Sequence, residues 1–126
     1  MKKNALRANR KRMKEEFEHQ SKIGQLGKTG LSRVAFTVPF TKVRKYAQSL
    51  MKNAGMKTKI DAFGNLYGRK EGKQKNLPTV MLGSHLDSQN PGGRFDGPAG
   101  VLTALEAIRI LKENKIDHEH PIEVVA

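Results

Sequence analysis

The chain has 126 residues, which is enough for one domain, and its hydrophobic content of 37% allows only a small core. It has no cysteine, which excludes disulfides and thiolate metal sites, and no apolar run approaches the roughly 18 residues of a membrane span. The absence of cysteine and of an apolar leader predicts a cytoplasmic protein.

The formal net charge of +12 is unevenly distributed. Residues 1–76 carry 20 Lys and Arg against 5 Asp and Glu, whereas residues 77–126 carry 4 against 7. The second half is therefore mildly acidic, as expected where carboxylates gather to hold cations.

Residues 1–30 form a basic segment that leads into the rest of the chain. Residues 3–20 predict a charged helix with a narrow apolar stripe at Met13 and Phe17, which are four residues apart. The runs Lys2-Lys3 and Arg10-Lys11-Arg12 suggest an alternative role, in which this segment binds an acidic partner. The adjoining glutamates and the scarcity of aromatic residues disfavour nucleic acid as that partner.

The remaining elements alternate between helical and extended patterns. Residues 21–38 carry several glycines and predict a loop. After it we expect an amphipathic helix ending before Gly55, a hairpin, a buried strand, a second helix with Pro98 in its first turn, and a final strand. These elements span residues 40–54, 56–61 with 65–69, 77–83, 98–115 and 122–125. This order indicates an α/β fold with a strand–helix–strand crossover over residues 78–125.

A histidine and two carboxylates follow the predicted buried strand. His85 and Asp87 are two residues apart, so in an extended segment they point to the same side. Asp96 returns through the Gly92-Gly93 loop. Sites in open α/β sheets form at the carboxyl ends of strands, and His with Asp is a metal-ligand set, with Asp87 as a candidate to orient the imidazole.

Simpler interpretations of these residues remain open. A single histidine after a strand is more often a surface or core residue than a ligand. Asp96 immediately precedes the predicted helix and would also stabilise its positive N-terminal end, and Asp87 would suit a turn. His118 and His120 lie in a predicted loop, where solvated histidines are the better interpretation.

Three motifs resemble the metal-site region of the M20-type amidohydrolases, and within these the hydantoinase/carbamoylase group. That group contains N-carbamoyl-L-amino-acid hydrolases, allantoate amidohydrolases and β-ureidopropionases. The motifs are Gly83-Ser84-His85-Leu86-Asp87-Ser88, Gly92-Gly93-Arg94-Phe95-Asp96-Gly97 and Gly100-Val101-Leu102-Thr103-Ala104-Leu105-Glu106. The hairpin from Asp61 to Arg69 and the strand from Pro121 to Ala126 also resemble this group, so the likeness covers residues 31–126.

The resemblance implies roles for the three side chains. His85 would be a ligand of one metal ion, Asp96 would bridge two ions, and Asp87 would act as a catalytic residue that orients His85. The cofactors would be two divalent ions, Zn, Mn, Co or Ni, activating a bridging water. The substrate would be a small N-carbamoyl or ureido compound whose linear C–N bond is hydrolysed, and the full-length enzymes of the group are expected to be homodimers.

The resemblance further implies that residues 1–126 form the N-terminal part of a three-layer α/β/α zinc-peptidase-like catalytic domain with a mixed sheet. In relatives, the strand matching Ile122–Ala126 leads into a Glu-Glu pair that supplies the general base and a ligand. The chain ends before that pair and before the lid or dimerisation domain, so we expect it to be inactive alone. A degenerate product without catalysis is the alternative.

Overall fold

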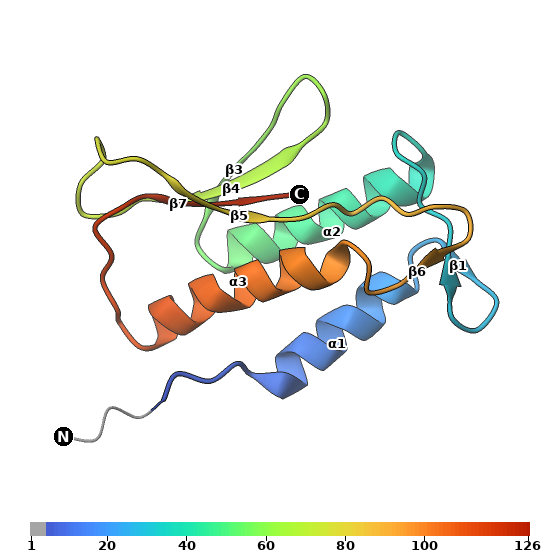
Figure 1. Ribbon diagram of the computed structural model, residues 1–126, viewed down its shortest axis with the longest axis horizontal. Helices are drawn as coiled ribbons and strands as arrows, with labels where there is room; N and C mark the ends of the chain where they lie inside the picture. The colour runs from blue at the N-terminus through green and yellow to red at the C-terminus, as the bar shows by residue number, and fades with distance from the viewer. Residues whose placement is uncertain (1–4) are drawn as a thin grey trace.

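A mixed four-stranded sheet forms the centre of the protein, in a computed structural model that describes residues 5–126. The strand order is β3-β4-β7-β5 (Figure 1). The strands are β3 (Lys57–Ile60), β4 (Leu66–Lys70), β7 (Ile122–Val125) and β5 (Val80–Gly83). β4 pairs antiparallel with β3 and with β7, whereas β5 runs parallel to β7. The predicted α/β class with a mixed sheet is thus confirmed.

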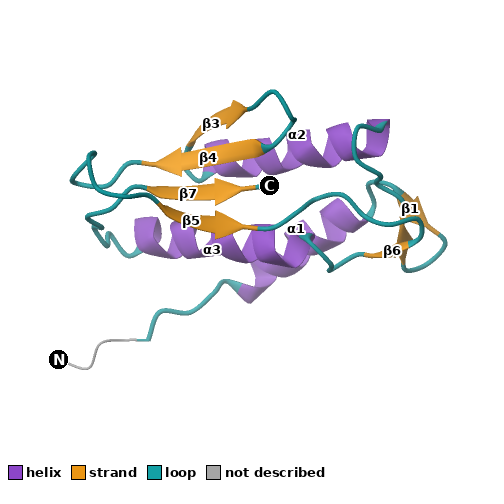
Figure 2. Ribbon diagram, turned by 45° about the horizontal axis from the view of Figure 1, so that its top comes forward, coloured by secondary structure: helices purple, strands orange, loops and turns teal. Residues whose placement is uncertain are grey.

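Two long helices cover one face of this sheet (Figures 1 and 2). α2 (Val38–Asn53) packs on β3 and β4, and α3 (Pro98–Glu113) packs on β5 and β7. α1 (Arg10–Ser21) contacts α3 from the side away from the sheet (Figure 1). Within residues 5–126, none of the helices has the length and apolar character needed to cross a membrane.

The core lies between the helices and the sheet, where the predicted apolar stripes face inward. A helix places residues three and four apart on one side, and the buried residues of α2 and α3 follow that spacing. They meet the inward side chains of β4 and β7; the central buried members are Val43, Ala47, Met51, Leu66, Val101, Leu105 and Val124. Gly68 permits the close approach of α2, since a Cβ there would lie 2.8 Å from the Met51 sulfur.

The structure corrects several sequence-based expectations about the N-terminal half. The predicted loop at residues 21–38 contains two short strands, β1 (Gln25–Leu26) and β2 (Gly30–Leu31). With β6 (Gly92–Gly93) they form a second sheet of order β1-β2-β6. Strands of two residues are too short to show an alternating pattern. The first helix begins at Arg10, where the Asn9 side chain accepts a hydrogen bond from the Arg12 N–H as an N-cap, so residues 5–9 are not helical, contrary to the prediction. The predicted start at residue 3 lies outside the described residues.

The strand predicted at residues 77–83 is present at Val80–Gly83, but the prediction that it is buried was wrong. β5 is the outermost strand of its sheet, and Val80, Met81 and Leu82 are all exposed, Met81 by 59%. An apolar run indicates burial only when neighbours cover both faces and both edges of the strand. In the described part of the chain, β5 has a neighbouring strand on one side alone.

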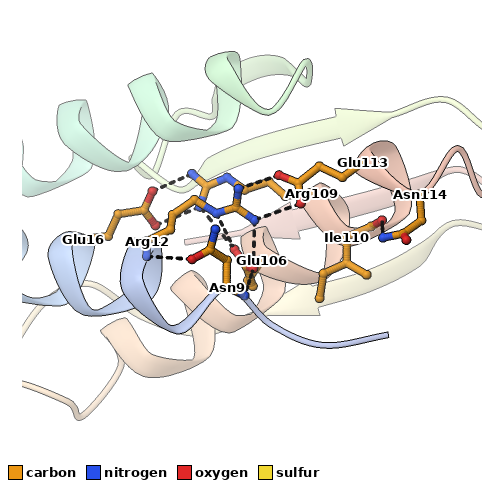
Figure 3. A network of polar contacts seen from close by, with 8 residues as sticks. All are labelled: Asn9, Arg12, Glu16, Glu106, Arg109, Ile110, Glu113 and Asn114. Atoms are coloured by element: carbon orange, nitrogen blue, oxygen red, sulfur yellow. Dashed lines mark hydrogen bonds and ion pairs between the residues drawn. The ribbon is translucent and has the colours of Figure 1, made fainter. Parts of the chain in front are cut away.

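Ion pairs rather than apolar contacts dominate the packing of α1 on α3 (Figure 3). The Arg12 guanidinium donates to both Glu106 carboxylate oxygens, at 2.9 and 2.8 Å, and also pairs with Glu113. In a second ion pair the charges are exchanged between the helices: Arg109 of α3 pairs with Glu16 of α1 at 2.8 Å. The side chain of Glu106 is only 2% exposed, so this carboxylate is a buried charge that depends on its partners.

The surroundings of Glu106 determine its ionisation. Burial alone raises the pKa of this carboxyl, but the hydrogen bonds from the Arg12 side chain and the Asn9 backbone N–H outweigh burial, and the net pKa lies below its ordinary value. The same ion pairs raise the pKa of the Arg12 guanidinium. Both groups therefore stay charged, and their attraction holds the first helix in place.

The basic N-terminal segment is partly neutralised by these contacts. Arg12 is paired with α3, and Lys11 and Lys14 face Glu15 and Glu18 at 4.0 and 3.8 Å. The second basic run, Lys2-Lys3, lies outside the described residues. The surface of α1 therefore offers alternating charges rather than a continuous basic patch.

We predict that Glu106→Gln lowers the free energy of unfolding by about 2 kcal/mol near neutral pH, because Arg12 loses a buried anionic partner. The pKa of Glu106 is lowered in the folded protein, so its stabilisation is present above the ordinary value of 4.5 and is lost as the pH falls through the folded value. The free energy of unfolding, measured with urea, should therefore change less with pH for the variant than for the wild type between neutral and acidic pH. Glu113→Gln is the control, since its side chain is 51% exposed and the expected cost is below about 1 kcal/mol.

Candidate metal centre

The candidate site lies where β5 and β7 end side by side. The parallel register pairs Gly83 with Val125, and the Ser84 N–H donates to the Val125 carbonyl at 3.2 Å. This last ladder bond fixes the segment that follows β5, which carries His85 and Asp87. The predicted position at the carboxyl end of a strand is confirmed.

The structure brings His85, Asp87 and Asp96 together. His85 Nδ1 lies 3.0 Å from the Asp87 carbonyl oxygen and 3.4 Å from its carboxylate. On the other side of the ring, His85 Nε2 lies 3.6 Å from the Asp96 carboxylate. The imidazole is thus flanked by both carboxylates, and its side chain is 47% exposed, which leaves the ring accessible.

This arrangement fits a divalent metal ion. An Nδ1–H that donates to Asp87 leaves the lone pair on Nε2, facing Asp96. Two ligand atoms of one tetrahedral zinc ion lie about 3.3 Å apart, close to the spacing observed between Nε2 and the Asp96 oxygen. A catalytic zinc site usually has three protein ligands, and residues 5–126 contain no cluster of three His, Cys, Asp or Glu suited to a metal. His85 and Asp96 alone therefore supply fewer ligands than such a zinc site requires.

The Asp96 side chain makes no capping hydrogen bond to α3. The N-cap position is Gly97, and no side-chain hydrogen bond caps the helix there. The Asp96 side chain is 78% exposed, and its carboxylate faces His85 Nε2. Because Asp96 directly precedes the N-cap, its position is compatible both with stabilisation of the helix end by its charge and with the predicted ligand role.

Two glycines of α3 allow the helix to approach the site closely. Gly97 has φ of +88°, and a Cβ there would lie 2.6 Å from the His85 ring and still closer to the His85 carbonyl oxygen. A Cβ at Gly100 would lie 2.6 Å from the Ser84 side chain. Because neither position carries a side chain, the start of α3 packs directly against the His85 segment, and Asp96 is held next to the imidazole.

Arg33 and Ser88 hold the segment that carries Asp87, and the sequence analysis missed this role of both residues. The Ser88 Oγ accepts from the Arg33 N–H at 2.9 Å, and the Ser88 N–H donates to the Arg33 carbonyl at 3.1 Å. The Arg33 side chain is fully buried and donates to Gln20, with Nε and Nη2 unpartnered. Burial lowers the pKa of Arg33 to about 10, and the charge of Asp87 opposes that shift.

The other histidines and acidic residues considered lie elsewhere. His118 is half-buried and His120 is exposed in the loop before β7. Their Nδ1 atoms face the carbonyl oxygens of His120 and Pro78, respectively, at 2.7 Å. This agrees with the interpretation of both as loop residues. Glu123 in β7 pairs with Arg69 at 3.1 Å and is directed to its sheet neighbours rather than to the site.

Comparison with known proteins first defines the class. The family model described as Peptidase family M28 matches residues 65–126, which include the hairpin return, the candidate site and β7. A hydantoinase/carbamoylase family amidase from Burkholderia ambifaria superposes on 98% of this chain with a TM-score of 0.93 and 35% sequence identity. The chain therefore has the fold of the matched 30% of this amidase.

Sequence relatives narrow the assignment. An N-carbamoyl-L-amino-acid amidohydrolase from Pseudomonas sp. (strain NS671) is 43% identical over 86% of the chain, and a ureidoglycolate hydrolase from Arabidopsis thaliana is 33% identical over 90%. The resemblance to the hydantoinase/carbamoylase group is confirmed: the chain is a homologue of these amidohydrolases. It spans 27% and 24% of the length of these two relatives and 30% of the Burkholderia structure.

We predict that Gly97→Ala lowers the free energy of unfolding by about 2 kcal/mol or more, because alanine is strained at this backbone conformation and its Cβ collides with His85. The His85 ring resonances in NMR spectra should shift as the ring is displaced. Gly93→Ala is the matched control: no atom lies within 4 Å of a Cβ built there, so we expect little change. Equal unfolding curves for the two variants would contradict the close-approach argument.

Proposed function

We propose that this chain provides part of the catalytic metal centre of an amidohydrolase that cleaves the linear C–N bond of N-carbamoyl amino acids or related ureido compounds. The observation that carries the proposal is the position of the Asp96 carboxylate, 3.6 Å from His85 Nε2. His85 directly follows Ser84, whose N–H makes the last hydrogen bond between the segments of β5 and β7. The names of the relatives support the substrate class. The activity is proposed for the whole protein, since the chain corresponds to less than a third of the relatives' length.

Each of the three residues has a distinct role in this proposal. His85 and Asp96 hold a divalent ion, and Asp87 accepts the Nδ1 proton of His85, which keeps the Nε2 lone pair available. Zn, Mn, Co or Ni are compatible with imidazole and carboxylate ligands. Such ions polarise a carbonyl group and lower the pKa of water. Hydrolysis of an N-carbamoyl amino acid consumes water and releases the free amino acid, carbon dioxide and ammonia.

The described residues leave part of the chemistry to other groups. A general base and at least one further ligand are needed beyond His85 and Asp96. We therefore propose that residues 5–126 bind metal weakly and gain full affinity only with additional ligands. A homodimer and a cytoplasmic location stay predictions that follow from the sequence and its resemblance.

Metal binding by the chain tests the ligand assignment. We expect weak Zn²⁺ or Co²⁺ binding in isothermal titration calorimetry, reduced at least about 10-fold in His85→Ala and in Asp96→Asn because each removes one of two ligands. His118→Ala is a matched control, since the ring of His118 also faces the carbonyl oxygen two residues further along the chain. Equal losses from His85→Ala and His118→Ala would refute the assignment.

Hydrolysis by the whole protein tests the activity. We expect release of free amino acid from N-carbamoyl-L-amino acids in the presence of Zn²⁺, Mn²⁺, Co²⁺ or Ni²⁺. We also expect a loss of about 10- to 100-fold in kcat/KM for Asp87→Asn, because this substitution removes the negative charge 3.4 Å from His85 Nδ1. A whole protein that binds metal through His85 and hydrolyses neither N-carbamoyl amino acids nor allantoate with any of these ions would favour the alternative of a product without catalysis.

A further inference from the structure

A cavity of about 260 Å³ lies beside the candidate metal centre, and its lining is part polar and part aromatic. The polar lining comes from Ser84, His85, Asp87 and Asn65. Three phenylalanines form its aromatic wall, and the end of β7 also lines it; these residues are Phe36, Phe40, Phe63, Val125 and Ala126. The cavity is smaller than the roughly 300 Å³ of typical ligand pockets, so its size suits one substituent of a substrate.

The aromatic wall is held in place by rigid local structure. Asp61 accepts hydrogen bonds from the Phe63 and Asn65 N–H groups at 3.0 and 2.9 Å, which closes the hairpin turn that carries Phe63. Arg44 of α2 donates to the Gly64 carbonyl at 2.9 Å and lies over the Phe40 ring. The backbone of the turn is therefore fixed against α2, which places Phe63 at the edge of the cavity.

Phe36 adds a second exposed ring, on a backbone that is held by local hydrogen bonds. Its φ of +66° lies in the left-handed region, which bulky residues rarely adopt. The following residue stabilises this conformation, because Thr37 donates to the Val34 carbonyl through both its N–H and its hydroxyl. Phe36 and Phe63 are each 81% exposed, so both rings face solvent at the mouth of the cavity and gain free energy when an apolar group covers them.

The lining disfavours an anionic occupant and favours an apolar one at the phenyl rings. Among the described residues that line the cavity there is no lysine or arginine, and the carboxylate of Asp87 repels anions. A hydroxyl-bearing or charged substituent packed against the three phenyl rings would gain no hydrogen bond from them, whereas Asn65 and Ser84 offer polar groups elsewhere in the lining. An aromatic or large aliphatic side chain gains from burial there, at about 0.8 kcal/mol for each CH₂ removed from water.

We propose that this cavity is a specificity subsite that receives the apolar side chain of an N-carbamoyl amino acid whose ureido group lies at His85. The identity of the ligand as a substrate rests on the proposed function. The subsite distinguishes amino acids with large apolar side chains from ureidoglycolate, which carries a hydroxyl group in that position. Phe36 and Phe63 determine this specificity, and Phe40 with Arg44 positions the turn.

Binding of matched ligands to the chain tests the subsite. By NMR titration we expect N-carbamoyl-L-phenylalanine to bind at least about 10-fold more tightly than N-carbamoylglycine, which has the same polar groups without a side chain. Phe36→Ala and Phe63→Ala should each reduce this ratio to about 3-fold or less, with unchanged affinity for N-carbamoylglycine. Phe63→Leu should retain most of the preference, because leucine still covers the apolar side chain.

Controls separate this inference from folding and from the proposed activity. Both rings are 81% exposed, so the variants should keep the wild-type thermal unfolding curve, and Ile116→Ala, in the loop after α3, should leave the ratio unchanged. Similar affinity for the two ligands, no detectable binding of either, or a ratio insensitive to Phe36 and Phe63 would overturn the subsite. If the whole protein hydrolyses neither compound while the preference persists, the proposed function fails and the subsite stands as an apolar binding site.

Discussion

The close approach between α3 and the segment after β5 is the constraint on which the candidate site depends. Gly97 and Gly100 have no side chains, so the helix start lies against Ser84 and His85. This contact sets where the chain re-enters after the Gly92-Gly93 loop, and so where Asp96 lies relative to the imidazole. The candidate pair, with ten residues between its members, thus owes its geometry to the absence of two Cβ atoms.

The opposite side of the molecule is organised by charge instead of by close backbone contact. Arg12 and Glu106 join α1 to α3, and α3 in turn carries the approach to His85 at its other end. One helix therefore connects an electrostatic interface with the candidate metal centre. The buried Arg33, bonded through its backbone to Ser88, provides a second link between the N-terminal region and the site.

Periodicity and spacing predicted much of this architecture, and the failures have identifiable physical causes. The helical stripe of α2 and the strand–helix–strand unit follow from side-chain spacing, which is local information. The exposure of β5 depends on which strand lies beside it, so its apolar residues misled the prediction. His85 and Asp96 could be paired from the sequence because glycines punctuate the loop between them. Arg33 could not, since nothing local distinguishes a buried guanidinium from a solvated one.

The outer edge of β5 has a practical consequence for work on the isolated chain. Its outward backbone N–H and C=O groups have no partner strand among the described residues, and its apolar side chains are exposed. An uncovered edge of this kind is a template on which a strand of another molecule adds by hydrogen bonding. Thermodynamic measurements on the chain should therefore be repeated over a series of dilutions. Addition of one molecule to another through this edge is second order in protein concentration, so it disappears as the concentration falls.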